Sequence, residues 1–127
     1  MTTSSCKVLV VDDNHDAADS VVILLQLWGH EAVAAYSGQQ CIEIAKRFDP
    51  DVVLMDLGLP GQDGFAVKEE VARICPGVRV VALTGYTRAD IVRRTRDEGF
   101  AAHLTKPVEA PQLENAVKQQ CSVAKAL

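Results

Sequence analysis

The chain has 127 residues, of which 48% are hydrophobic and 24% charged, values typical of one globular domain with its own core. Its formal net charge of −4 disfavours non-specific binding to nucleic acid, so we expect no direct nucleic-acid partner. The opening MTTSSCKVLVV has one lysine and a short apolar run, which excludes a secretion signal or a membrane span in this segment. We therefore expect a cytoplasmic protein without membrane contact.

No linker or low-complexity segment interrupts the sequence. Residues 1–5 are predicted to be a flexible N-terminal tail, residues 6–122 one domain, and residues 123–127 a C-terminal tail. Four cysteines lie far apart and form no C-x-x-C pair: Cys6, Cys41, Cys75 and Cys121. Because no signal peptide is present, we expect four free thiols in a reducing cytosol.

Apolar, β-branched runs alternate with segments of helical period along the chain. Four runs predict strands, and a weaker, more polar run predicts a fifth: Val8–Val11, Val33–Tyr36, Val52–Met55, Val78–Leu83 and Phe100–Leu104. Each run is followed by apolar residues three or four apart, which predict a helix. Three runs are almost entirely apolar, as expected of strands buried on both faces. Strict alternation of five β-α units predicts an α/β fold in which helices cover both faces of a parallel five-stranded sheet.

Reactive side chains follow the predicted strands at the points where the strands end. Asp12 and Asp13 follow the first strand, Asp56 the third, Thr84 the fourth and Lys106 the fifth. Taken singly, each has an ordinary explanation as a turn former, a helix cap, a strand residue or a solvated loop residue. The functional crevice of such a sheet lies at the carboxyl ends of its strands. We therefore expect these residues to converge on one pocket.

Other acids near strand ends are explained by local structure alone. Asp16 is the candidate N-cap of the first helix, and Asp63 is expected to cap a helix that begins near Gly64. Asp51 follows a proline and is expected in a turn.

Three carboxylates in one pocket repel one another unless a cation lies among them. Oxygen ligands alone favour Mg²⁺ or Mn²⁺, whereas zinc would need a cluster of histidines and cysteines that the sequence lacks. A carboxylate beside such a cation and a lysine can attack phosphorus and hold the product acyl phosphate. Asp56 is the best candidate nucleophile because it stands alone at its strand end, whereas the adjacent Asp12 and Asp13 suit a metal clamp.

Four motifs occur together in this chain, in the order VVDDN, LMDLGLPGQDG, ALTGY and LTKP. With them the chain resembles the CheY-like receiver domains of two-component response regulators, from about Lys7 to about Gln120. The resemblance implies a three-layer, doubly wound (βα)5 flavodoxin-like fold with strand order 2-1-3-4-5. It also implies that Asp56 takes a phosphoryl group from a phosphohistidine on a histidine kinase or a histidine phosphotransfer protein.

The same resemblance implies a set of magnesium ligands. Asp13 and Asp56 would bind Mg²⁺ through their carboxylates, and Gly58 would bind it through its backbone carbonyl. Asp12 would hold the ion mostly through water. Lys106 would contact the phosphoryl group.

Two further features of the family concern the switch. The bond between Lys106 and Pro107 would be cis, and Thr84 would be the hydroxyl that moves toward the phosphate after transfer. His103 stands where the family often has an aromatic partner of that threonine. It is therefore either a switch residue with an imidazole in place of the usual ring, or an exposed strand histidine.

Two positions that tune self-hydrolysis in the family are occupied here by Gly58 and Tyr86. Gly58 has no side chain to orient an attacking water, and Tyr86 is expected to shield the phosphate. The resemblance therefore predicts a phosphate lifetime that is not set by an orienting amide.

The resemblance predicts a signalling surface on the fourth helix, the fifth strand and the fifth helix, where an unidentified downstream target would bind. The fourth helix is rich in arginine, and it is either a solvated helix or part of that docking face: Arg88, Arg93, Arg94 and Arg96. By itself the chain is expected to be a phosphoacceptor with slow self-dephosphorylation and no turnover.

Alternatives remain open for the parent protein and for the chemistry. The chain fits a stand-alone phosphorelay protein or the receiver segment of a hybrid sensor histidine kinase. The alternative function is a Mg²⁺-dependent aspartyl-phosphate phosphatase. It is disfavoured because such enzymes place two acids two residues apart after the first strand, where this chain has adjacent acids.

Overall fold

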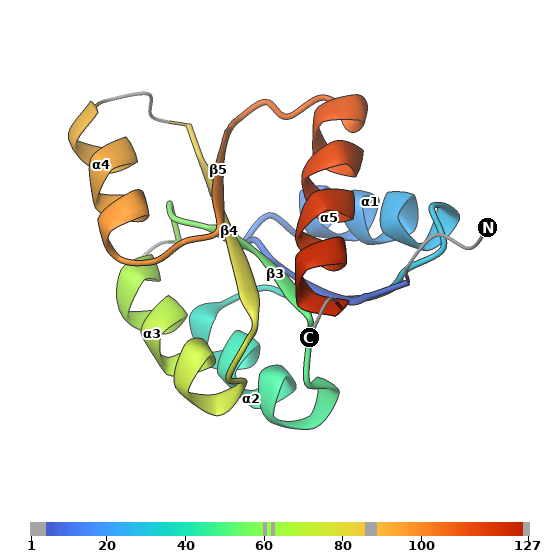
Figure 1. The fold of residues 1–127 in the computed structure, drawn as a ribbon, viewed down its shortest axis with the longest axis horizontal. Helices are drawn as coiled ribbons and strands as arrows, with labels where there is room; N and C mark the ends of the chain where they lie inside the picture. The colour runs from blue at the N-terminus through green and yellow to red at the C-terminus, as the bar shows by residue number, and fades with distance from the viewer. Residues whose placement is uncertain (1–4, 60, 62, 86–88, 126–127) are drawn as a thin grey trace.

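The structure, a computed structural model, describes residues 5–59, 61, 63–85 and 89–125. Five strands alternate with five helices over this part of the chain (Figure 1). Their bounds are β1 Lys7–Val11, α1 His15–Leu27, β2 Glu31–Ala35, α2 Gly38–Phe48, β3 Val52–Asp56, α3 Gly64–Ile74, β4 Arg79–Thr84, α4 Ala89–Asp97, β5 Ala102–Thr105 and α5 Ala110–Lys125. The predicted β-α alternation is confirmed.

The five strands form one parallel sheet in the order β2-β1-β3-β4-β5. This order confirms the predicted doubly wound, flavodoxin-like fold. β3 lies at the centre, and all five of its residues are buried. Because all strands run the same way, their carboxyl ends lie along one edge of the sheet, where the predicted site residues are found.

Two apolar cores lie on opposite faces of the sheet, since successive residues of a strand point to opposite sides. Leu9 and Val53 belong to the core under α2 and α3, whereas Val8 and Leu54 belong to the core under α1 and α5. Figure 1 shows α1 with α5 on one side of the sheet and α2 with α3 on the other. This two-sided burial explains the nearly continuous apolar runs in the sequence.

Helix ends are fixed by short polar side chains that accept backbone hydrogen bonds. Asp63 caps α3, as predicted, by accepting from the Phe65 amide at 2.9 Å. The prediction that Asp16 caps α1 is wrong, because Asn14 occupies the N-cap and accepts from the Ala17 amide at 3.0 Å. Asp16 instead lies in the first turn, where its negative charge favours the helix dipole.

The last strand begins later than the apolar pattern predicts. The amide of Phe100 donates to the carbonyl of Thr95 at 3.0 Å, so Phe100 closes the end of α4 and does not begin β5. Gly99 makes this turn possible with a φ of 85°, a value that costs a glycine little. β5 therefore covers Ala102–Thr105.

The chain ends differ in part from the predicted tails. α5 continues to Lys125, so residues 123–125 belong to this helix. Residues 1–4 and 126–127 lie outside the described part of the chain, as do Tyr86 and Arg88. Within the described part, no helix is long and apolar enough to cross a membrane.

The prediction of four free thiols is wrong. Cys6 and Cys121 form a disulfide, although 115 residues separate them in sequence. Cys41 and Cys75 are free and buried. Val8 of β1 and Val117 of α5 lie in the same apolar core, and sequence spacing alone does not reveal such a long-range neighbour.

α4 is held to the rest of the domain mainly by polar and charged contacts. Thr95 is its one buried residue among those described. The guanidinium of Arg94 lies 3.8 Å from the ring centre of Phe65 on α3. The Nζ of Lys68 donates to the carbonyl oxygen of Glu98 at 2.6 Å. A helix with so little apolar burial is expected to open more easily than its neighbours.

Candidate functional site

The acids at the ends of β1 and β3 come together at the carboxyl edge of the sheet. Asp12 and Asp56 are each 6% exposed, whereas Asp13 is exposed. The register pairs Val11 with Met55, so the residues that follow these two also lie side by side. One carboxylate oxygen from each of the three acids lies within 4.8 Å of the others. Such a donor set suits a hard, oxygen-preferring cation.

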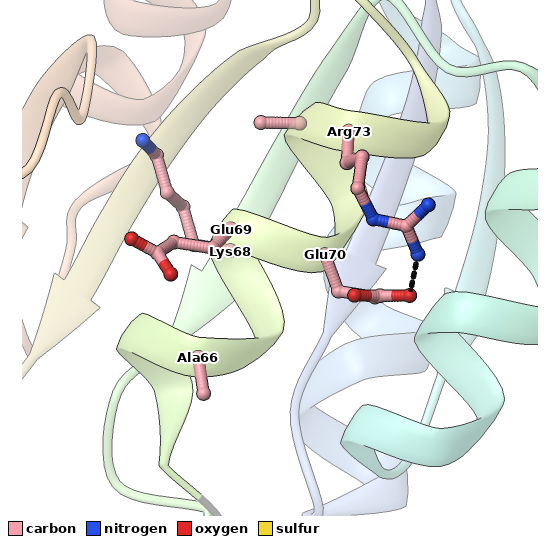
Figure 2. A pocket seen from close by; sticks show the side chains of 6 residues that line it. Ala66, Lys68, Glu69, Glu70 and Arg73 are labelled. Atoms are coloured by element: carbon pink, nitrogen blue, oxygen red, sulfur yellow. Dashed lines mark hydrogen bonds and ion pairs between the residues drawn. The ribbon is translucent and has the colours of Figure 1, made fainter.

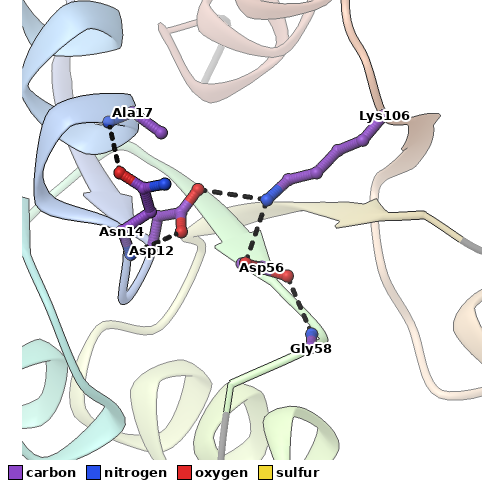
Figure 3. A network of polar contacts seen from close by, with 6 residues as sticks. All are labelled: Asp12, Asn14, Ala17, Asp56, Gly58 and Lys106. Carbon is purple, nitrogen blue, oxygen red and sulfur yellow. Dashed lines mark hydrogen bonds and ion pairs between the residues drawn. The ribbon is translucent and has the colours of Figure 1, made fainter.

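Lys106 reaches into this acidic cluster from the end of β5. Its Nζ donates to Asp12 Oδ2 at 3.1 Å and to Asp56 Oδ2 at 3.0 Å (Figure 3). Partial burial lowers the Lys106 pKa, but the hydrogen bonds to the two carboxylates outweigh this effect and raise the pKa above its usual 10.5. The ammonium therefore remains charged at neutral pH and compensates the two buried acids.

A tight turn after β1 fixes the orientation of Asp12. Its Oδ1 accepts from the amide of Asn14 at 3.0 Å, and the Asn14 side chain in turn caps α1 (Figure 3). The acid is thus held by the backbone on one oxygen and by Lys106 on the other. The sequence reading missed Asn14, although an aspartate two residues before an asparagine at a helix start is a typical pattern of an Asx turn.

A ring contact anchors the first turn of α1 to the end of β2. The rings of His15 and Tyr36 stack with their centres 3.8 Å apart. The Tyr36 hydroxyl donates to Asp19 at 2.6 Å, and this hydrogen bond is the main cause that raises the Tyr36 pKa above 10. This contact joins the residue after β2 to the helix that follows the two adjacent acids, and no sequence motif indicated it.

The loop after β3 holds the second oxygen of Asp56. The Gly58 amide donates to Asp56 Oδ1 at 2.8 Å, so both oxygens of this carboxylate are hydrogen-bonded. A Cβ atom added to Gly58 would lie 3.3 Å from the same Oδ1, closer than most such contacts. A side chain at position 58 would therefore press directly on the carboxylate.

Thr84 and Lys106 lie together at the ends of β4 and β5. Thr84 is 2% exposed, and its carbonyl accepts from the Lys106 amide at 2.8 Å. The bond between Lys106 and Pro107 is cis, as predicted. The register pairs Asp56 with Leu83, which places Thr84 next to the end of β3. The structure thus brings all five predicted strand-end residues to one edge.

His103 on β5 lies opposite Ala82 on the neighbouring strand β4. Ala82 comes two residues before Thr84 on that strand. Residues two apart on a strand share a face, so His103 and Thr84 lie on the same side of the sheet. The side chain is partly buried, and its Nε2 is buried without a hydrogen-bond partner among the described residues. An exposed strand histidine, one of the two alternatives from sequence, is therefore wrong.

An open, largely apolar groove of about 400 Å³ borders the acidic cluster. Asp12 and Lys106 lie at its polar end, and α1 contributes Ala17 and Val21. The segment after the cis proline supplies Val108 and Leu113 on the other side. The groove therefore gives an apolar surface immediately beside the acidic cluster.

A second hollow lies on the outer surface of α3, and its six lining residues all come from this helix (Figure 2). Arg73 pairs with Glu70 on one side of the helix, whereas Lys68 extends away from them to reach the carbonyl of Glu98. The Arg73–Glu70 pair and the Lys68 ammonium therefore point to different sides and do not converge as the three acids do.

Comparisons with known proteins agree with this geometry. A family model described as the response regulator receiver domain matches residues 8–118. The chain is 28% identical over 113 residues to sporulation initiation phosphotransferase F from Bacillus subtilis (strain 168), across 89% of this chain and 91% of that protein. It is 35% identical over 115 residues to transcriptional regulatory protein PdtaR from Mycobacterium tuberculosis (strain ATCC 25618 / H37Rv), across 88% of this chain and 55% of that protein. The chain thus spans about half the length of PdtaR.

A solved structure gives the same fold. The CheY-like receiver domain protein from Methanospirillum hungatei JF-1 superposes with a TM-score of 0.87 at 24% identity, across 94% of this chain and 95% of that one. The fold and the acidic edge define a receiver module of two-component signalling. This chain belongs to the response regulator receiver domain family.

Proposed function

We propose that this chain is a phosphoacceptor in which Asp56 takes a phosphoryl group from a phosphohistidine. The observation that carries the proposal is the Asp56 carboxylate beside two further acids, with Lys106 Nζ 3.0 Å from its Oδ2. The partner would be a histidine kinase or a histidine phosphotransfer protein, the classes with which receiver domains interact. The similarity to a protein named a phosphotransferase supports a role in a phosphorelay.

The proposed transfer is a displacement at phosphorus. An oxygen of Asp56 forms a bond to phosphorus while the bond from phosphorus to the histidine nitrogen breaks, and the imidazole leaves with that electron pair. Lys106 lies where it can donate to a phosphoryl oxygen as charge builds there. The Thr84 hydroxyl, next to the end of β3, would then bond another oxygen of the product.

Asp12, Asp13 and Asp56 would hold Mg²⁺ or Mn²⁺ together with the carbonyl of Gly58, because hard cations prefer such oxygen donors. When bound, the ion would neutralise the carboxylates and the phosphoryl oxygens. The exposed position of Asp13 supports this role, since this side chain remains accessible to an incoming cation.

The apolar groove beside the acids would receive the histidine-bearing partner. It lies between α1 and the segment after Pro107, so a helix seated there would bring its histidine close to Asp56. Phosphorylation would then be read on the face formed by α4, β5 and α5, through Thr84 and the partly buried His103. The few apolar contacts of α4 support such a rearrangement, because this helix can move at low cost.

Intact mass measured after incubation with acetyl phosphate and Mg²⁺ tests the proposal. One added phosphoryl group is expected in the wild type, none in Asp56→Asn, and none when EDTA removes the divalent cation. Asp97→Asn, which changes an exposed acid of α4, is the matched control and should be labelled like the wild type. Labelling that persists in Asp56→Asn would refute the assignment. Sustained release of p-nitrophenol from p-nitrophenyl phosphate would show a phosphatase instead.

A further inference from the structure

A covalent link joins the first strand to the last helix at the edge of the sheet opposite the acids. Cys6 immediately precedes β1, Cys121 lies within α5, and their Cα atoms are 5.9 Å apart. The two cysteines are 2% and 1% exposed. Since this Cα separation is ordinary for disulfides, the two thiols would remain within bonding reach after reduction as long as α5 stays in place.

The other two cysteines are buried like Cys6 and Cys121, but they are not joined by a disulfide. Cys41 and Cys75 are free thiols inside the core under α2 and α3, where burial raises the Cys41 pKa to about 12. The Cys75 thiol donates to the carbonyl of Ala45 at 3.6 Å. A buried thiol that remains protonated is a poor nucleophile in thiol exchange. This second pair therefore provides an internal control within the same chain.

Within the described part of the chain, few other contacts hold residues 117–125, which are called here the C-terminal half of α5. Gln120 accepts from the Nε of Arg79 at 3.0 Å, and Lys125 lies 3.4 Å from Asp51. The second pair is a partly exposed ion pair of the kind that contributes little to stability. Of the side chains that α5 buries in this half, only Val117 and Cys121 belong to the apolar core. The disulfide is thus the strongest single restraint on this part of the helix.

We propose that Cys6 and Cys121 form a reversible thiol–disulfide site whose redox state controls the mobility of the C-terminal half of α5. The oxidant is a low-molecular-weight disulfide of the glutathione class, and the reductant is a dithiol. This inference goes beyond the proposed phosphoacceptor function and does not depend on it. In a reducing compartment a bond of this kind is expected to form transiently, in response to oxidation.

The chemistry balances in two exchanges. The thiolate of one cysteine attacks the oxidant, RSSR, so that its sulfur–sulfur bond breaks, one RS⁻ leaves and a mixed disulfide forms. The thiolate of the other cysteine then attacks the protein sulfur of that mixed disulfide, which closes the bond between Cys6 and Cys121 and releases the second RS⁻. The two thiol protons pass through solvent to the two RS⁻ groups, and two electrons pass from the cysteines to the reagent.

Access to the buried sulfur atoms follows from their place near the ends of a strand and a helix. Cys121 lies close to the end of α5, and Cys6 lies just outside the first strand. Local opening of element ends costs less free energy than global unfolding, so exchange does not require the domain to unfold. The acids are remote from this chemistry, because Asp12 follows Cys6 by six residues of nearly extended chain, roughly 20 Å.

The test starts with the wild-type chain equilibrated in glutathione buffers that run from fully reduced to fully oxidised. After acid quenching and alkylation under denaturing conditions, intact mass counts the free thiols. We expect all four cysteines to be alkylated at the reduced end and two at the oxidised end, with a peptide map that joins Cys6 to Cys121. Dithiothreitol added under native conditions should restore four free thiols.

Hydrogen exchange then compares the oxidised and reduced forms of the same sequence. Amides of residues 117–125 should exchange at least about tenfold more slowly in the oxidised form, whereas amides around the acidic cluster should not change. Labelling by acetyl phosphate should be the same in both forms. Cys6→Ser and Cys121→Ser should each abolish the redox dependence. Cys75→Ala, a matched change outside the pair, should retain it.

Three results would overturn the proposal, and none requires a variant to fold. The bond between Cys6 and Cys121 could fail to form with oxidised glutathione. It could persist at the reduced end of the series, which would make it a permanent structural bond. The exchange of residues 117–125 could be identical in the two forms, which would leave the bond without effect on α5.

Discussion

Removal of the Lys106 ammonium by Lys106→Met should destabilise the folded chain when no divalent cation is present. The substitution keeps an unbranched side chain of similar length and removes the charge that lies 3.1 Å from Asp12 and 3.0 Å from Asp56. Both carboxylate side chains are 9% exposed, so they cannot regain full hydration without a structural change. They would be left as two neighbouring, uncompensated negative charges.

The magnitude follows from the burial of the three groups. Removal of one partner from a fully buried ion pair costs about 3–5 kcal/mol. The Lys106 side chain is 35% exposed, so solvent screening reduces the expected loss to about 1–2 kcal/mol of unfolding free energy. For a chain of this length, the loss corresponds to a melting temperature lower by roughly 4–8 °C.

Thermal unfolding followed by circular dichroism, in EDTA and in millimolar MgCl₂, measures this effect. Mg²⁺ should stabilise Lys106→Met more than the wild type, because the cation then meets the same acids without a competing ammonium. Lys118→Met, at an exposed position of α5, is the control and should melt like the wild type. Adding Asp12→Asn to Lys106→Met should recover part of the loss.

The reasoning is refuted if Lys106→Met in EDTA melts at or above the temperature of the wild type. This result would mean that the ammonium does not compensate the buried carboxylates. Equal stabilisation of the variant and the wild type by Mg²⁺ would show that the cation and the lysine do not share these acids.

The remaining predictions concern position 58, His30 and α4. Gly58→Asn should change the rate of phosphate loss from Asp56 by on the order of tenfold, which is about 1.4 kcal/mol of activation free energy. The reason is that the new side chain presses on the carboxylate and can orient an attacking water. An unchanged half-life of the phosphorylated form, measured by intact mass, would contradict this. Burial lowers the His30 pKa below 6.5, and the smaller effect of Glu114 opposes this. The contribution of neutral His30 to stability is therefore complete above pH 6.5 and declines as the pH falls toward the pKa of the folded state. His30→Asn should therefore flatten the dependence of the urea midpoint on pH just below 6.5, and parallel curves for the two proteins would disprove it. Arg94→Ala removes the cation that lies over the Phe65 ring and should speed hydrogen exchange in α4. The control Arg93→Ala, at a position that is also exposed, should not, and equal exchange in both variants would exclude a role for the ring contact.

The central part of the fold could be read from the sequence because its pattern is local. The run Val52–Met55 is apolar at every position, which is typical only of a strand covered on both faces, and it matches β3 to within one residue. The edge strand β5 was harder to delimit. Phe100 has the apolar character of a strand residue, but the turn at Gly99 assigns it to the end of α4.

The candidate site could be predicted to the level of its residues but not of its contacts. Parallel strands bring their carboxyl ends to one edge, so Asp12, Asp56 and Lys106 could be expected together once the alternation was recognised. That Lys106 bonds both acids at once depends on where β5 ends relative to β1 and β3. Likewise, the burial of His103 Nε2 depends on the elements that cover this face of the sheet.

The sequence by itself determined the order of the strands and helices, the acids at the strand ends and the family. These features depend on residue type and spacing within a few positions, which local sterics and periodic burial translate directly into structure. Only the tertiary structure decided that Cys6 meets Cys121, since the packing of α5 on one face of the sheet brings together residues 115 positions apart. It also decided that Lys106 lies between Asp12 and Asp56, because a distance between side chains on separate strands is set by how the whole sheet packs and twists.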